Sequence, residues 1–296
     1  MANQKEIRAR ISSTISTQQI TKAMKLVSAT KLRKASEAII RMRPYAQKLQ
    51  GIMGNLQEST DDAQLAGYFE NREAKRVLLL VITSDRGLCG AFNANVVKRV
   101  RQLLDTDYAA AHQAGNVTLM CMGKKGGEAL KRYGYSVNMD MVNLTQSLDS
   151  QKAFAAMQSV IDSYLADQYD RVEVVYNKFK NAATQIVTAE KLLPVELEAF
   201  ETKEAEGTKY ASDFSFEPSK TDLLFTIIPR AVKTQLYRTM LDSQASEHGS
   251  RMVAMDKATD NAGDLIFKLK LQYNQARQAA ITTEILEIVG LSLIHI

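Results

Sequence analysis

The sequence predicts a mixed fold, in which two long terminal helices pair as an antiparallel coiled coil and a doubly wound α/β domain lies between them in the chain. Three observations support this prediction. Residues 2–43 contain neither proline nor glycine, and residues 230–289 contain no proline and only two glycines. Between these stretches the hydrophobic pattern changes from a helical period to short, continuous apolar runs of strand length.

The N-terminal segment, residues 1–58, is predicted to be one coiled-coil helix. It is rich in residue types that favour helix, such as Ala, Met, Leu, Lys and Arg. Apolar or small side chains recur at helical spacing and are expected to form the buried stripe (Ile7, Ile11, Ile20, Ala23, Val27 and Thr30). About forty helical residues span roughly 60 Å, about twice the width of a small domain, so this helix needs a second long helix as its partner.

The same segment is strongly basic. Residues 1–50 contain eleven Lys and Arg against two acids, a net charge of +9, whereas the whole chain carries +5. A basic helix indicates an acidic partner, which could be nucleic acid, anionic lipid or an acidic protein surface. A solvated basic face is the alternative that charge alone leaves open.

Residues 75–200 are predicted to form a doubly wound, Rossmann-like α/β domain. The run Val77–Thr83 is apolar throughout, as in a parallel strand that is covered on both faces. Strands that alternate with helices indicate right-handed crossovers. Further strands are expected at 117–122, 171–179 and, near the sheet edge, 184–193, and helices at 94–104, 126–133 and 151–166.

Residues 201–220 are polar and are predicted to be a loop, and residues 221–290 to be the second coiled-coil helix, which would reach roughly 90 Å. Its apolar side chains follow helical spacing (Val232, Leu236, Met240, Ala258, Ala262, Leu265, Leu269, Ala276 and Ala280). Alanine, serine and threonine are frequent in both helices. The pair should therefore be thin, bury little apolar area and depend partly on a surrounding partner.

The composition excludes several classes of protein. No apolar run approaches the roughly 18 residues of a membrane span, and the N-terminus lacks the apolar core of a secretory signal. The two cysteines, Cys89 and Cys121, do not suggest a disulfide framework. We therefore expect a protein that is made and kept in the reducing cytosol.

The glycine-containing turns of the α/β domain do not match nucleotide-binding motifs. The turn at 83–93 has two glycines but lacks the third glycine of a dinucleotide fingerprint. The segment Gly123–Gly127 has lysines but no following Ser or Thr of a phosphate loop. Tight strand-to-helix turns need glycine for backbone reasons, so we interpret both as structural turns and predict no cofactor.

Residues that could act as nucleophiles or metal ligands are scattered. Cys89 lies near Arg86 and could be a thiol of lowered pKa, although a small packed residue is the commoner role. Asp85 has no second convergent group, and we interpret it as a cap or as a partner of Arg86. The histidines, His112, His248 and His295, lack the spacing of a triad or of a metal site, so no catalytic or metal-binding residue is predicted.

Three stretches of the sequence carry a more specific pattern and cover the chain to about residue 290. They are Lys5–Arg8 with Gln19–Met24 and Ala29–Arg33, then Thr83–Asn93, and then Ser246–Asn261 with Tyr273–Gln278 and Ile281–Glu284. These stretches, in this order, resemble the gamma subunits of bacterial F-type ATP synthases. The resemblance implies a central rotor stalk that is not itself a catalyst. It would couple rotation of the c ring, driven by protons or sodium, to ATP synthesis or hydrolysis in the beta subunits.

The resemblance also implies the partners. These are a hexameric ring of alpha and beta subunits around the upper coil, an epsilon subunit at the side, and the c ring below, at the cytoplasmic face of the plasma membrane and without insertion into it. The side chains expected to contact the alpha/beta ring are Lys22, Met24 and Lys25, which would face an acidic lever of beta, and Arg277, Gln278, Thr282 and Glu284, which would lie near the top of the stalk. Phe214, Phe216 and Glu217 are expected at the c ring.

Residues 291–296 depart from the family pattern, which continues with a second small residue and an alanine-rich end. The sequence Leu-Ser-Leu-Ile-His-Ile is what the start of a common transposon sequencing adaptor encodes. We therefore hypothesise that this tail is an assembly artefact, with a divergent natural tail as the alternative.

Two other functions are weighed against this one. A basic coiled-coil protein that binds nucleic acid would explain the charge of the N-terminal helix but not the three family stretches, and it predicts salt-dependent retention on DNA. A nucleotide-dependent α/β enzyme would explain the middle domain, but the glycine turns disagree with it. Neither nucleic acid nor nucleotide is therefore expected as a ligand.

Overall fold

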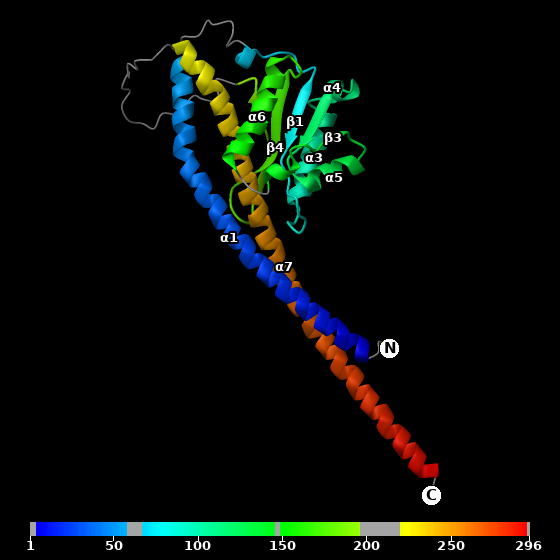
Figure 1. The fold of residues 1–296 in the computed structure, drawn as a ribbon. Helices are drawn as coiled ribbons and strands as arrows, with labels where there is room; N and C mark the ends of the chain where they lie inside the picture. The colour runs from blue at the N-terminus through cyan, green and yellow to red at the C-terminus, as the bar shows by residue number, and fades with distance from the viewer. Residues whose placement is uncertain (1–3, 58–66, 146–148, 196–219, 295–296) are drawn as a thin grey trace. The chain divides into compact units, whose positions relative to one another are not determined.

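The computed structural model describes residues 4–57, 67–145, 149–195 and 220–294. The chain divides into two compact units, each treated separately below. The terminal unit combines Met1–Ala29 with Arg251–Ile296, and the central unit is Thr30–Ser250. Two long helices, α1 (Gln4–Gln57) and α7 (Lys220–Ile294), contribute to both units (Figure 1). Each continues through an internal proline, Pro44 in α1 and Pro229 in α7.

The central unit is built on a five-stranded mixed sheet in the order β3-β2-β1-β4-β5. The first four strands are parallel, and β5 pairs antiparallel with β4 at the edge. The four expected strands are confirmed, including the edge position of the last, whereas β3 was missed because two residues give no readable period. The strands are β1 (Val77–Val81), β2 (Val117–Cys121), β3 (Val137–Asn138), β4 (Arg171–Phe179) and β5 (Gln185–Leu193).

Helices cover both faces of this sheet (Figure 1). Alternate residues of β1 explain why its sequence is apolar throughout: Leu78 and Leu80 pack towards α6, and Leu79 packs towards α3. The three expected helices are confirmed, and the short α4 is an addition. The helices are α3 (Phe92–Asp105), α4 (Ala109–Gln113), α5 (Lys124–Arg132) and α6 (Ser150–Leu165).

The first part of α7 belongs to the core of the central unit. Its side chains at 3–4 spacing, Val232, Leu236 and Met240, are buried in the same apolar cluster as α6 and β1. From their spacing, these residues were predicted to lie in the coiled coil alone. Helical spacing identifies a buried face without specifying what covers it, and here a sheet and a helix share that task.

In the terminal unit, α1 and α7 pack against each other in antiparallel orientation. The Oγ1 atoms of Thr21 and Thr259 lie 2.8 Å apart, and the Gln18 side-chain amide donates to the Thr259 carbonyl at 3.3 Å. One turn further along α1, Lys25 forms an ion pair with Asp256. The contact partners run in opposite directions: the later residue of α1, Lys25, meets the earlier residue of α7, Asp256. This confirms the expected antiparallel pairing.

The seam between these two helices differs from the predicted stripe. In α1, Ile20 and Val27 are 60% and 57% exposed, whereas their neighbours Thr21 and Ser28 are buried. In α7 the expected Leu265 is exposed, and Ile266 takes its place in the seam. Other members of the predicted stripe are buried as expected, among them Ile7, Ala262 and Leu269. The stripe was wrong at Ile20, Val27 and Leu265, where the adjacent residue is the buried one, because helical spacing alone does not fix which of two neighbouring positions faces the partner helix.

Candidate functional site

The predicted ring-contact residues of both helices belong to the terminal unit but form two separate groups, because those of α1 lie at the level of Asp256, about 30 Å along α7 from Arg277. In α1, Lys22 is exposed, Met24 is half-buried, and Lys25 is half-buried and paired with Asp256 within the chain. The four predicted residues of α7 are all exposed (Arg277, Gln278, Thr282 and Glu284). The remaining predicted contacts, Phe214, Phe216 and Glu217, lie outside the described residues.

The last part of α7 has an apolar surface that the terminal unit does not cover. No residue from Lys270 to Val289 is buried, and the helix extends beyond the N-terminal end of α1 (Figure 1). Large apolar side chains are 47–67% exposed along this part (Ile281, Ile285, Leu286, Ile288 and Val289). Contiguous exposed apolar side chains of this kind mark a surface for another protein, and a helix without tertiary packing is marginal in water.

The paired part of the unit also exposes apolar side chains. Ile15, Ile20, Leu26 and Val27 of α1 are 36–62% exposed. The seam itself is narrow, because a Cβ on Gly263 would lie 3.2 Å from the Gln18 side-chain nitrogen. The terminal unit is therefore a thin helix pair that buries few apolar side chains of its own and presents others outwards. Sequence reasoning missed this outward set because it placed Ile20 and Val27 in the seam.

The α/β domain fills the position at which related folds bind phosphate. At the N-terminus of a helix, free backbone amides attract anions. In α5 the amide of Lys124 donates to Asp85 Oδ1 at 3.0 Å, that of Lys125 to the Ser84 carbonyl at 3.0 Å, and that of Gly126 to Thr83 Oγ1 at 3.0 Å. Three amides of this helix N-terminus are thus occupied by the segment that follows β1. This geometry confirms the interpretation of Asp85 as a cap.

The glycines of α5 serve close packing in the same place. A Cβ on Gly123 would lie 2.0 Å from the Thr83 carbonyl oxygen, and a Cβ on Gly126 would lie 2.5 Å from the Thr83 side chain. In the other turn, Gly90 has φ +59°, a left-handed conformation that favours glycine. Both turns therefore need glycine for the backbone, which confirms the structural interpretation.

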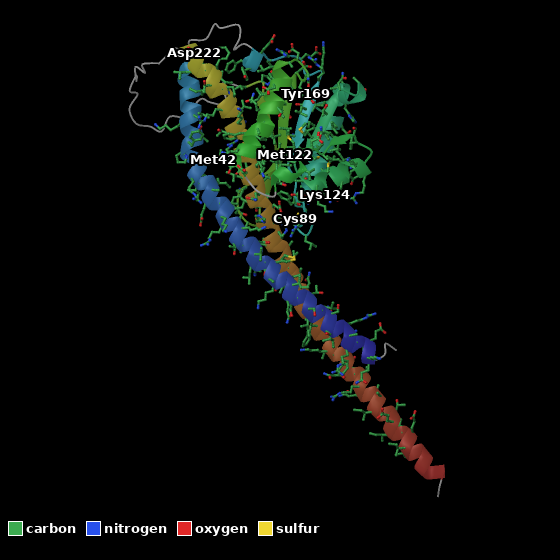
Figure 2. The ribbon with its side chains drawn as sticks, viewed as in Figure 1. Met42, Cys89, Met122, Lys124, Tyr169 and Asp222 are labelled. Atoms are coloured by element: carbon green, nitrogen blue, oxygen red, sulfur yellow. The ribbon has the colours of Figure 1, made fainter. Side chains whose placement is uncertain are left out.

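The thiol of Cys89 is enclosed by its own turn. Its side chain is buried, and the Asn93 side-chain nitrogen lies 3.3 Å from Sγ. The Cys89 carbonyl accepts a hydrogen bond from Ser250 Oγ of α7 at 2.7 Å. Figure 2 labels Cys89 and Lys124 at the same end of the domain. Burial makes the packed role the better interpretation of Cys89, and burial also raises the pKa of the second cysteine, Cys121, to about 12.

Within residues 4–57, 67–145, 149–195 and 220–294, no three His, Cys, Asp or Glu side chains are grouped as metal ligands would be. None of the helices in these ranges combines the length and the apolar character that crossing a lipid bilayer requires.

Comparison with known proteins places these features in a family. Residues 3–291 match the family model described as ATP synthase. The ATP synthase gamma chain of Cytophaga hutchinsonii is 50% identical over 290 residues, covering 98% of both chains. That of Flavobacterium johnsoniae is 48% identical over 290 residues with the same coverage.

Solved structures give a matching fold. A chain from the rotor of the Euglena gracilis mitochondrial ATP synthase superimposes with a TM-score of 0.66 at 23% identity, covering 94% of this chain and 98% of that one. A chain from the central stalk and c-ring structure of the Tetrahymena thermophila mitochondrial enzyme gives a TM-score of 0.57 at 27% identity, covering 81% and 99%.

Proposed function

Because this chain belongs to the family of ATP synthase gamma chains, we propose that it is the central rotor stalk of an F-type ATP synthase. It turns with the c ring and couples ion flow to ATP synthesis or hydrolysis in the beta subunits. The observation that supports this most directly is the uncovered apolar surface of α7, where no residue from Lys270 to Val289 is buried. A ring of partner subunits around this helix would cover that surface.

On this proposal the chain has no catalytic role of its own. Its Rossmann-like domain uses the amides of α5 for internal hydrogen bonds with Thr83, Ser84 and Asp85, which leaves them engaged where a phosphate would otherwise bind. On this proposal the complex lies at the cytoplasmic face of the membrane, with the epsilon subunit beside the stalk and the c ring below it.

Contacts with the ring follow from the exposed residues of the terminal unit. Arg277, Gln278, Thr282 and Glu284 would meet the alpha and beta subunits along α7, and Lys22 and Met24 of α1 would meet the acidic lever of beta. Lys25 takes a double role, because its ammonium group also pairs with Asp256 in the chain. The segment with Phe214, Phe216 and Glu217 would contact the c ring.

Torque would pass mainly through steric contact. A shaft without rotational symmetry presents a different face to each beta subunit, and different contact energies are what drive different conformations. Exposed ion pairs contribute only about 0–1 kcal/mol each, so the basic residues would set preferred angles more than they transmit force.

The test is reconstitution of the chain with alpha and beta subunits, followed by ATPase and single-molecule rotation assays. The unmodified chain should assemble and rotate, and Lys22→Glu should slow rotation without stopping it. Lys25→Glu alone also breaks the ion pair with Asp256, so the charge-swapped double variant with Asp256→Lys separates the partner contact from the pair inside the chain. Failure to assemble would refute the stalk, and complete loss of torque in an assembled Lys22→Glu complex would refute the steric mechanism.

A further inference from the structure

The central unit contains a cavity of about 680 Å³ between α1, α7 and the edge strand β5. Met42, labelled in Figure 2, is one of the α1 residues that line it. Its volume is within the range of sites that bind small molecules. The proposed stalk function does not use this cavity.

Two buried polar side chains line the cavity. Thr234 is 2% exposed, and its Oγ1 has no hydrogen-bond partner in the described part of the chain. Asp242 is 9% exposed, and its carboxyl group forms no ion pair within 4.0 Å among the described residues. Buried polar groups are costly unless they are hydrogen-bonded, so both point to a polar occupant.

The residues that line the two ends of the cavity differ in chemistry. One end is apolar, where Leu49, Val195 and Ala231 meet, and the other holds Asp242 with Lys178. Two contacts show how α7 runs along β5. Gln235 donates to Glu190 in the middle of the strand, and Gly249, further along α7, packs beside the turn that precedes β5. Asp242 therefore lies towards the start of β5, and Ala231 towards its end. Residues 231 and 242 lie about 16 Å apart along the helix axis.

The charged end carries an excess of positive charge. Arg43, Lys178 and Arg238 all act electrostatically on Asp242. The carboxylate of Glu190 is already used, because it accepts from Tyr176 Oη at 2.8 Å and pairs with Arg238. Arg43 and Lys178, both solvent-exposed, are therefore the cations that remain near this buried acid.

Burial and the neighbouring charges act on the buried acid in opposite directions. Burial is the largest influence on the carboxyl group of Asp242 and raises its pKa, while Arg238, Lys178 and Arg43 lower the pKa and Glu190 raises it.

We infer that this cavity binds a single-chain amphiphile with an anionic head group, such as a medium-chain carboxylate. The head lies between Arg43 and Lys178, beside Asp242, and the alkyl chain extends along α7 towards Leu49 and Val195. The Thr234 hydroxyl donates to the head group or to a water that accompanies it.

The experiment uses the full-length chain assembled with alpha and beta subunits in detergent-free buffer. A diazirine derivative of dodecanoate is photocrosslinked, and the labelled peptides are identified by mass spectrometry. We expect saturable labelling of the segments 39–49, 188–195 and 231–242. Unlabelled dodecanoate should compete, and dodecylamine, which has the same chain and the opposite charge, should compete at least tenfold less well.

Matched variants make the result decisive. Arg43→Gln with Lys178→Gln should raise the apparent Kd for dodecanoate at least tenfold, whereas Arg41→Gln, on the same helix but outside the cavity, should leave it unchanged. Ala231→Leu should reduce labelling by filling the apolar end. Labelling that does not saturate, that spreads over other peptides, that dodecylamine blocks equally well, or that is the same in the double variant would overturn the inference.

Discussion

The hydroxyl group of Thr83 gives the sharpest test of how the α/β domain closes its own phosphate position. Its Oγ1 accepts from the Gly126 amide at 3.0 Å and donates to the Gly123 carbonyl at 3.1 Å, and the residue is 1% exposed. Thr83→Val keeps the shape of the side chain and removes both bonds.

The expected loss of stability follows from the two groups left behind. A buried group that loses its hydrogen-bond partner costs about 1–3 kcal/mol. The Gly126 amide bears most of this cost, because the Gly123 carbonyl still accepts from the Gly127 amide at 3.4 Å. We expect a total of about 2–4 kcal/mol. At about 1.4 kcal/mol per factor of ten, this corresponds to roughly 30- to 1000-fold faster opening of the N-terminus of α5.

Hydrogen exchange of the full chain, read by mass spectrometry in peptides covering residues 120–133, measures this opening. Thr83→Ser is the matched control: it keeps the hydroxyl group, loses one methyl group and should change exchange much less. If Thr83→Val exchanges like the unmodified chain, or if both variants accelerate equally, the hydroxyl group does not hold this helix end and the reasoning fails.

Two further predictions concern other contacts of the central unit. A Cβ on Gly249 would lie 3.1 Å from the backbone of the turn before β5, so Gly249→Val should destabilise the unit by about 1–3 kcal/mol. Gly249→Ala should cost less, because alanine is smaller and gains helix propensity. Chemical denaturation compares the two variants, and equal midpoints would contradict the packing argument. Hydrogen bonds from Arg76 hold the pKa of Asp170 below its ordinary value of 3.8, so this carboxylate stabilises the fold above about pH 4 and its contribution is lost as pH falls through the lowered pKa. The Asp170→Asn variant should therefore be less stable than the unmodified chain at pH 7, and the difference in unfolding free energy should shrink in acid. A difference in unfolding free energy that does not depend on pH would contradict this role of Asp170.

Much of the central unit could be predicted because its signals are local. A strand that is apolar at every position, such as β1, is legible without knowing its neighbours, since both faces of a doubly wound sheet are buried. The edge strand β5 was also recognised, whereas β3 has two residues and owes its place to pairing with β2. The contact residues of the candidate site were predicted from family resemblance alone, and the exposed apolar surface of α7 beside them was not predicted.

The sequence by itself determined that both ends of the chain are long helices and that a sheet with helices on both faces lies between them, because uninterrupted helical spacing and strand-length apolar runs are properties of neighbouring residues. Only the tertiary structure decided which face of each helix is buried: Thr21 lies in the seam, Ile20 points outwards, and the first part of α7 packs on the sheet. The physical reason is that burial depends on how closely two surfaces can approach and hydrogen-bond, and that is a property of the pair of surfaces that neither helix encodes alone.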